Sequence, residues 1–246
     1  MYLPSHISRI MLLSPKGGSG KTTLATNLAG YLAGRGEPTT LIDFDSQGSS
    51  THWLAVRDPG RPHIHGIAAY RNPVGITRSW QFRLPAETRR IIIDTPAAVK
   101  GPQLADMVRL ADTILIPVLP SHIDIHALAH FMEDLLITGK VRALNTRVGI
   151  VANRIRHNTN VFQSLERFLR TLDFPFVGQI REAQSYVRAA GLGVGIHDLP
   201  AGRTGRDRAQ WTRLLAWIEA PQRPAAPAAD TGHSGRIYRT PAPLHP

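Results

Sequence analysis

Short apolar runs recur along the first 180 residues, and helical patterns separate them. The runs are continuous and rich in β-branched residues, which is typical of strands buried on both faces of a parallel sheet. The runs predicted as strands are residues 9–13, 39–43, 90–94, 113–119, 148–152 and 176–180. We therefore predict an α/β fold. Its sheet is doubly wound and mostly parallel, with helices on both faces and a ligand site beyond the carboxyl ends of the strands.

The first run leads into a glycine-rich segment, S-P-K-G-G-S-G-K-T-T at residues 14–23, and a helix is predicted for residues 21–34. In the phosphate-loop pattern G-x-x-x-x-G-K-[ST], backbone N–H groups surround phosphates, the lysine contacts the β/γ-phosphates and the hydroxyl binds Mg²⁺. Gly20, Lys21 and Thr22 fill the last three positions, whereas Pro15 stands where the pattern has its first glycine. This segment makes the fold P-loop NTPase-like, and Lys16 adds a second cation to it.

Three further polar segments follow predicted strands. Asp43 and Asp45 stand in the segment L-I-D-F-D-S-Q-G. Asp94 follows the isoleucine run of I-I-I-D-T-P, as the aspartate of a Walker B strand does. Asn153 stands at a strand tip in V-A-N-R. Any one of these aspartates could be an ordinary helix cap. All four segments in this order, each at the end of an apolar run, predict a nucleotide site.

The segments K-G-G-x-G-K-T-T, L-I-D-F-D-x-Q-G and I-I-I-D-T-P resemble the deviant Walker A motifs of the ParA/MinD family of ATPases. The resemblance covers about residues 9–199 and includes A-D-T-I-L-I-P-V-L-P-S-H-I-D-I-H-A-L. It implies ATP and Mg²⁺ as cofactors, a homodimer formed on ATP, and slow, partner-stimulated hydrolysis to ADP and phosphate. The chain departs from the family's usual D-P-Q-G at Asp45-Ser-Gln-Gly48, which predicts a looser switch loop.

The resemblance also assigns roles to residues. Lys16 would reach the phosphates of the partner subunit as an arginine finger does, Lys21 would neutralise those of its own subunit, and Asp45 would orient the attacking water. These three are the predicted catalytic residues. The predicted metal-site residues are Thr22, Asp43 and Asp94. The predicted nucleotide-binding residues are Lys16, Gly17, Gly18, Ser19, Gly20, Lys21, Thr22, Thr23 and Asn153, the last at a position that often reads the base edge.

The chain is strongly basic, with a formal net charge of +11. Such a balance favours a polyanionic partner, either nucleic acid or an acidic membrane. Residues 147–188 hold seven arginines against three acidic residues, although a solvated surface would explain the same pattern. Arginines bound to phosphates give salt-dependent binding without reading bases. The predicted DNA-binding residues are Arg154, Arg156, Arg181 and Arg188.

The resemblance and the charge predict a ParA-like ATPase that dimerises on ATP, binds DNA non-specifically and positions or segregates a plasmid, chromosome or protein cargo such as carboxysomes. It would be cytoplasmic and nucleoid-associated, with an activating adaptor that is ParB-like or cargo-linked. One alternative is a MinD-like membrane-cycling ATPase anchored by a helix predicted at residues 206–220. A less favoured alternative is an ATP-dependent metabolic synthetase. The absence of cysteine excludes an iron-protein type of reductase.

The remaining features bear on domain organisation. Residues 1–220 are predicted to form one domain, and the Pro/Ala-rich residues 221–246 to be a disordered tail. No stretch is long and apolar enough for a membrane span. His122, His126 and His130 recur on a predicted helix and are interpreted as polar surface or dimer-interface residues rather than metal ligands, whereas His65 is assigned to a Pro/Arg-rich loop.

Overall fold

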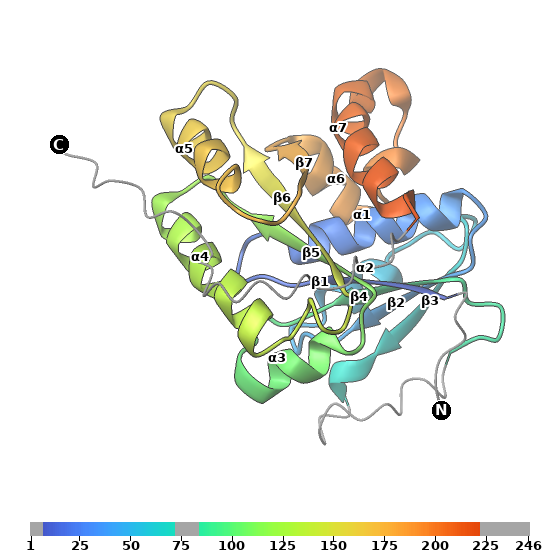
Figure 1. Ribbon diagram of the computed structural model, residues 1–246. Helices are drawn as coiled ribbons and strands as arrows, with labels where there is room; N and C mark the ends of the chain where they lie inside the picture. The colour runs from blue at the N-terminus through green and yellow to red at the C-terminus, as the bar shows by residue number, and fades with distance from the viewer. Residues whose placement is uncertain (1–6, 72–83, 222–246) are drawn as a thin grey trace.

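A computed structural model describes residues 7–71 and 84–221. The predicted tail lies outside the described residues, apart from Pro221. One sheet of seven strands, ordered β3-β2-β4-β1-β5-β6-β7, runs through the molecule, and every neighbouring pair is parallel (Figure 1). The strands are β1 (Ser8–Leu12), β2 (Thr39–Asp43), β3 (Ile64–Ala68), β4 (Arg90–Asp94), β5 (Thr113–Val118), β6 (Arg147–Ile155) and β7 (Phe176–Arg181).

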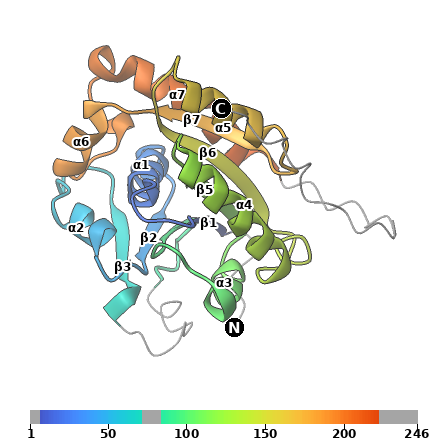
Figure 2. The same cartoon turned by 90° about the vertical axis from the view of Figure 1, so that its left-hand side faces the viewer.

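Helices cover both faces of the sheet, so the predicted doubly wound α/β fold is confirmed (Figures 1 and 2). The apolar side chains of α3, α4 and α5 join the core on one face, and those of α1, α2, α6 and α7 join the core on the other. Successive residues of β4 alternate between the two cores, because neighbouring side chains of a strand point to opposite faces. The helices are α1 (Lys21–Gly34), α2 (Ser49–Ala55), α3 (Gly101–Val108), α4 (His122–Ile137), α5 (Asn160–Leu169), α6 (Gln184–Gly191) and α7 (Ala201–Glu219), with short 3₁₀ turns η1 (Ala69–Arg71) and η3 (Ile196–Asp198).

Two details of the sequence interpretation are wrong. His65 lies in the edge strand β3 and not in a loop, and this strand was missed because only Ile64 and Ile67 of its five residues are buried. Asn153 lies inside β6 rather than at its tip. The strand continues to Ile155 through an irregular register, and Arg154 there has a left-handed φ of 51°, as in a β-bulge.

Helix α7 begins five residues before its predicted start, directly after Pro200. Its apolar stripe packs against the sheet, where Trp211, Leu214, Leu215 and Ile218 are all buried. The indole N–H of Trp211 donates a hydrogen bond to the Tyr186 hydroxyl at 3.0 Å. The stripe therefore serves core packing. No helix in the described part of the chain is long and apolar enough to cross a membrane.

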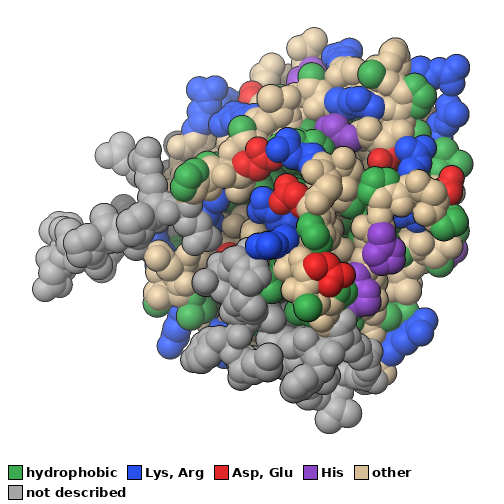
Figure 3. Space-filling model, turned by 90° about the vertical axis from the view of Figure 1, so that its right-hand side faces the viewer, with side chains coloured by type: hydrophobic (Ala, Val, Ile, Leu, Met, Phe, Trp, Pro, Cys, Tyr) green, Lys and Arg blue, Asp and Glu red, His purple; other side chains and the backbone are tan. Residues whose placement is uncertain are grey.

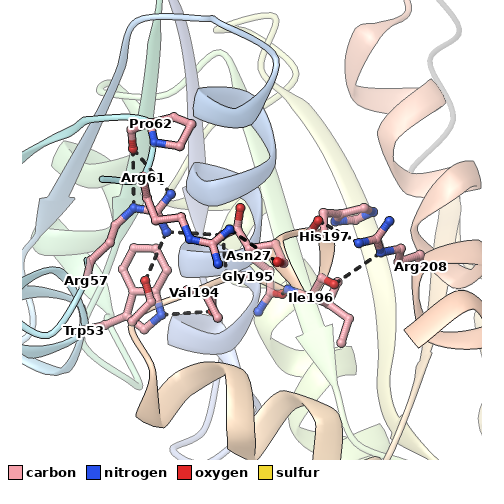
Figure 4. Close-up of polar contacts among 12 residues, drawn as sticks. Asn27, Trp53, Arg57, Arg61, Pro62, Val194, Gly195, Ile196, His197 and Arg208 are labelled. Carbon is pink, nitrogen blue, oxygen red and sulfur yellow. Dashed lines mark hydrogen bonds and ion pairs between the residues drawn. The ribbon is translucent and has the colours of Figure 1, made fainter. Parts of the chain in front are cut away.

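The segment between α6 and α7 is tied to three helices at once (Figure 4). From α1, Asn27 Oδ1 accepts the backbone N–H of Ile196 at 2.6 Å. From α2, the Trp53 indole donates to the carbonyl of Val194 at 3.3 Å. From α7, Arg208 donates to the carbonyls of Ile196, His197 and Leu199. These contacts hold the segment against the layer that carries α1 and α2.

A buried ion pair completes this junction. Arg57, just beyond α2, lies 3.2 Å from Asp198 Oδ2, and the two side chains are only 5% and 10% exposed. Arg57 also donates to the carbonyl of Gly193 at 3.0 Å, and Asp198 accepts the backbone N–H of Gly195 at 2.9 Å. Gly193 has a φ of 62°, and a Cβ there would lie 2.5 Å from the Arg57 backbone nitrogen, so only glycine fits this close approach.

Replacing Asp198 should therefore be costly. Asp198→Ala leaves the Arg57 guanidinium buried without its partner, and we expect a loss of about 3 kcal/mol in the free energy of unfolding. Asp106→Ala is the matched control, because Asp106 pairs with Arg109 at an exposed site, and we expect a loss below about 0.5 kcal/mol there. Urea unfolding measures both variants, and equal losses would contradict the structural role of the buried pair.

Candidate nucleotide site

The glycine-rich loop joins β1 to α1 on the side of the molecule that faces the viewer in Figure 2. Gly18 and Gly20 have φ values of 77° and 94°, a left-handed conformation that favours glycine. Asn153 from β6 is buried, and its side-chain amide donates to the carbonyl of Ser19 at 2.8 Å. A Cβ on Gly20 would lie 2.1 Å from the Asn153 amide nitrogen. The loop conformation is thus fixed by its glycines and by a strand far along the chain.

The loop leaves positive groups facing a common space. Helix α1 has no acidic residue in its first turn and no side-chain cap, so its N-terminal N–H groups remain available to an anion. Lys21, the first residue of α1, is buried, and this burial lowers the pKa of its ammonium, while Asp94 and Asp45 act in the opposite direction. A buried ammonium beside a helix N-terminus is suited to bind phosphate.

Asp94 is the most buried carboxylate of the site, with 1% of its surface exposed. Its Oδ2 accepts hydrogen bonds from the hydroxyls of Thr22 at 2.7 Å and Ser50 at 2.6 Å. Its Oδ1 is buried and has no hydrogen-bond partner among the described residues, and the same holds for Ser19 Oγ in the loop. Burial raises the pKa of Asp94 to about 6, and the two hydroxyls moderate that rise.

Asp43 lies beside Asp94 in the register of β2 and β4. Its Oδ2 accepts the backbone N–H and the hydroxyl of Thr51 at 2.9 and 3.0 Å, and its Oδ1 accepts the N–H of Asp45 at 3.0 Å. Burial raises the pKa of Asp43 as well. Because one oxygen is engaged by the following turn and the other by the start of α2, Asp43 holds both in place.

Asp45 lies in the turn that leads to α2. Its Oδ1 accepts the backbone N–H of Gln47 at 3.0 Å, and Gly48 closes the turn with a φ of 65°. A Cβ on Gly48 would lie 2.9 Å from the hydroxyl of Tyr70, so the turn packs closely against η1. The turn thus forms without the proline that the related motif usually has.

Lys16 is directed toward α4. Its Nζ lies 3.5 Å from Asp124 Oδ1, and its side chain is 39% exposed. Asp124 stands in the first turn of α4, where its N–H donates to Ser121 Oγ and its Oδ2 accepts the hydroxyl of the same serine. In the single chain, Lys16 is therefore held by an ion pair at the surface.

The structure places the Thr22 hydroxyl on Asp94 and the ammonium of Lys21 within electrostatic influence of Asp94, and it keeps Lys16 at the edge of the site. Sequence reasoning missed Ser50, Thr51 and Asp124. Ser50 and Thr51 follow Gly48 closely in the sequence, but only the start of α2 decides which hydroxyl faces which carboxylate. Among the described residues, no group of three or more His, Asp or Glu side chains could hold a metal ion, and His122, His126 and His130 are exposed on α4.

The predicted DNA-binding arginines differ in what they contact. The side chains of Arg154 and Arg188 are exposed and make no hydrogen bond or ion pair within the described ranges. Arg156 is also exposed but pairs with Glu182 at 2.6 Å. Arg181 lies beside Ile155 in the register of β6 and β7, and it pairs with the buried Asp207 at 2.5 Å.

Arg147, a further basic residue of the same region, is engaged within the protein and does not present its guanidinium to DNA. Arg147 lies over the ring of Trp217 at 4.3 Å and donates to the carbonyl of Ala220 at 3.0 Å. It anchors the end of α7 and contributes to stability rather than to a surface charge. Figure 3 shows the face opposite to the one seen in Figure 2, and Lys and Arg side chains occur there too, with Asp and Glu side chains between them. Net charge alone therefore does not locate a binding face.

The left-handed glycines, the buried lysine at a helix N-terminus and the carboxylate at the end of the neighbouring strand define a P-loop nucleotide-binding protein. Comparison with known families agrees. Residues 10–195 match the CobQ/CobB/MinD/ParA nucleotide binding domain, and the chain belongs to this family. The predicted ParA/MinD family membership is thus confirmed, and the family's members are ATPases.

Individual relatives come from partition and positioning systems. The chain is 30% identical over 191 residues to the Maintenance of carboxysome distribution protein A of Gloeobacter kilaueensis, covering 76% of this chain and 82% of that protein. It is 30% identical over 197 residues to the chromosome-partitioning ATPase Soj of Thermus thermophilus, covering 68% and 78%. The McdA–ATP complex of Cyanothece has the same fold, with a TM-score of 0.62 at 17% identity, covering 86% of this chain and 98% of that one.

The loop geometry makes Gly20 a sensitive position. Gly20→Ala adds a Cβ at a left-handed φ and against Asn153, so we expect affinity for a fluorescent ATP analogue to fall by at least about tenfold. Gly34→Ala is the matched control, because a Cβ at this last residue of α1 meets nothing within 4 Å. Titration of both variants measures the effect, and wild-type affinity in Gly20→Ala would contradict the assignment of this loop.

The raised pKa of Asp94 predicts a pH-dependent stability in the absence of nucleotide and metal. The folded carboxyl has a pKa of about 6 against 3.8 for the ordinary group. The folded protein therefore holds the proton more tightly, and this residue costs stability as pH rises from about 4 to 6 and above. Relative to wild type, Asp94→Asn should gain about 2 kcal/mol in the free energy of unfolding between pH 4 and pH 7.

Urea unfolding of both proteins in EDTA at several pH values checks this expectation. Asn retains an oxygen that can accept the hydroxyls of Thr22 and Ser50, so the main change is the loss of the buried charge. A difference between the two proteins that does not vary with pH would contradict the burial of an ionisable carboxyl at this point.

Proposed function

We propose that the chain is a ParA-like ATPase that dimerises on ATP, binds DNA non-specifically, and positions or segregates a plasmid, chromosome or protein cargo such as carboxysomes. The observation that carries this proposal is Lys16, a second lysine beside the phosphate loop that lies at the surface and outside the buried site of Lys21. The relatives in carboxysome distribution and chromosome partition support the same class of cargo.

The residues of the site have distinct parts in ATP hydrolysis. Lys21 and the N-terminus of α1 would bind the phosphates of their own subunit. Thr22 and Asp94 would hold Mg²⁺, which neutralises phosphate oxygens when bound. Asp94 fits such an ion because its Oδ1 is buried without a partner among the described residues, and hard divalent cations prefer oxygen ligands.

Asp45 and Lys16 would act on the reacting phosphate. Asp45 lies half-exposed in a hydrogen-bonded turn that Asp43 holds at the edge of the site, and its Oδ2 would orient the attacking water. Lys16 would leave Asp124 and place its ammonium on the phosphates of the partner subunit, where it stabilises developing negative charge. Hydrolysis would be slow until an activating adaptor, ParB-like or cargo-linked, stimulates it.

DNA binding would use the exposed arginines at the ends of β6 and β7 and on α6. Arg154, Arg156 and Arg188 are exposed and can reach phosphates, whereas Arg181 is partly committed to Asp207. Contacts of this kind carry no base sequence, so the protein would associate with the nucleoid wherever DNA is accessible. The membrane-cycling alternative has lost its main support, because the apolar stripe of α7 packs in the core.

The proposal predicts nucleotide- and salt-dependent DNA binding. Wild type should bind a fluorescent random-sequence duplex with ATP and far less with ADP, and Lys16→Ala should lose the ATP-dependent part, because it removes the contact between subunits. Arg154→Gln combined with Arg188→Gln should lower the salt dependence of binding by roughly two phosphate contacts.

Fluorescence anisotropy at two or more salt concentrations measures these effects. Arg142→Gln is the matched control, since Arg142 is exposed and pairs with Asp173 outside the proposed surface. DNA binding that is equal with ATP, ADP and no nucleotide would contradict the proposed function. An unchanged salt dependence in the double variant would contradict only the location of the DNA surface.

A further inference from the structure

The first turn of α2 contacts both strand-end carboxylates of the nucleotide site. Ser50 donates its hydroxyl to Asp94 at 2.6 Å, and the next residue, Thr51, donates to Asp43 through its hydroxyl and its N–H. Asp43 and Asp94 are register neighbours on β2 and β4. Consecutive residues of one helix are therefore each bound to one of two adjacent carboxylates.

Ser50 is buried completely, and its hydroxyl contacts a charged atom. Ser50 is the second residue of α2, so the helix offers no carbonyl one turn earlier for its hydroxyl. Ser50 instead shares Asp94 Oδ2 with Thr22, the hydroxyl assigned to Mg²⁺. Two donors on one oxygen, one from α1 and one from α2, fix the plane of the carboxylate more firmly than either alone.

The orientation of the Asp94 carboxylate indicates which of its oxygens is left for a ligand. With Oδ2 occupied by two hydroxyls, the other oxygen of Asp94 is left buried and without a partner among the described residues. A buried, unpaired carboxylate oxygen is costly unless a cation or a donor satisfies it. We propose that Ser50 is a positioning residue for the magnesium site: its hydrogen bond holds Asp94 so that Oδ1 is presented to the Mg²⁺ that accompanies the nucleotide.

This inference rests on the proposed binding of Mg²⁺ at Thr22 and Asp94, and it adds a residue from α2 to that site. Ser50 also lies two residues after Gly48, the N-cap of α2, and so next to the turn that carries Asp45. The same hydrogen bond therefore fixes the end of that turn relative to the metal-site carboxylate.

The test is a titration of Mg²⁺ against a fluorescent ADP analogue bound to the full chain, a readout that needs no hydrolysis. In Ser50→Ala we expect the half-saturating Mg²⁺ concentration to rise about tenfold, as for the loss of a hydrogen bond to a charged group. Nucleotide affinity in EDTA should stay within about twofold of wild type. Ser50→Cys keeps a weaker donor of similar size and should fall between the two.

Ser49→Ala is the matched control, because Ser49 is the preceding residue of the same turn and is exposed, so its Mg²⁺ dependence should equal that of wild type. Circular dichroism confirms that each variant is folded. A Ser50→Ala protein with the Mg²⁺ dependence of wild type would overturn the inference while leaving the proposed function intact, and so would an equal loss of nucleotide affinity with and without Mg²⁺. If Mg²⁺ has no effect on wild type, the proposed metal site fails, and the inference fails with it.

Discussion

A carboxylate removed from water at the end of a central strand sets the arrangement of the nucleotide site. One oxygen of Asp94 accepts hydrogen bonds from two hydroxyls, Thr22 in the first turn of α1 and Ser50 in the first turn of α2. Burying that charge is unfavourable and raises the pKa of the carboxyl, and either a proton or a bound cation would offset this cost. The glycine loop, the helix N-terminus and the turn of Asp45 all lie around this one group.

Helix α2 has polar contacts at both of its ends, and it joins the nucleotide site to the segment before α7. Its first turn is bound to Asp43 and Asp94, whereas its far end contacts the segment before α7 through Trp53 and the buried pair of Arg57 with Asp198. That segment follows α6, which carries Arg188. The nucleotide edge and the surface proposed for DNA are thus connected by a short helix with specific polar contacts at both ends. Such contacts hold the relative position of the two regions more strictly than apolar packing alone.

The sequence was informative where a residue's role depends on its own local pattern. Continuous apolar runs predicted the central strands, and the pattern of Gly20, Lys21 and Thr22 predicted the phosphate loop. The edge strand β3 was missed because only Ile64 and Ile67 of its five residues are buried and because it contains His65 and Gly66. Contacts between segments that are distant in the sequence could not be predicted, for a different reason. The bond from Asn153 to the Ser19 carbonyl joins residues 134 positions apart, and that from Ser50 to Asp94 depends on the register of α2 against β4. No local pattern encodes such pairings.

The central claim is that ATP joins two chains across Lys16. Sedimentation velocity of an Asp45→Ala variant, which should bind ATP without turning it over, tests this claim most directly. With ATP and Mg²⁺ the account predicts a species of twice the 27.0 kDa chain mass, and with ADP a species of the single-chain mass. Adding Lys16→Ala to this variant should weaken the ATP-bound dimer. A single species of the same mass with ATP, with ADP and without nucleotide would contradict the account.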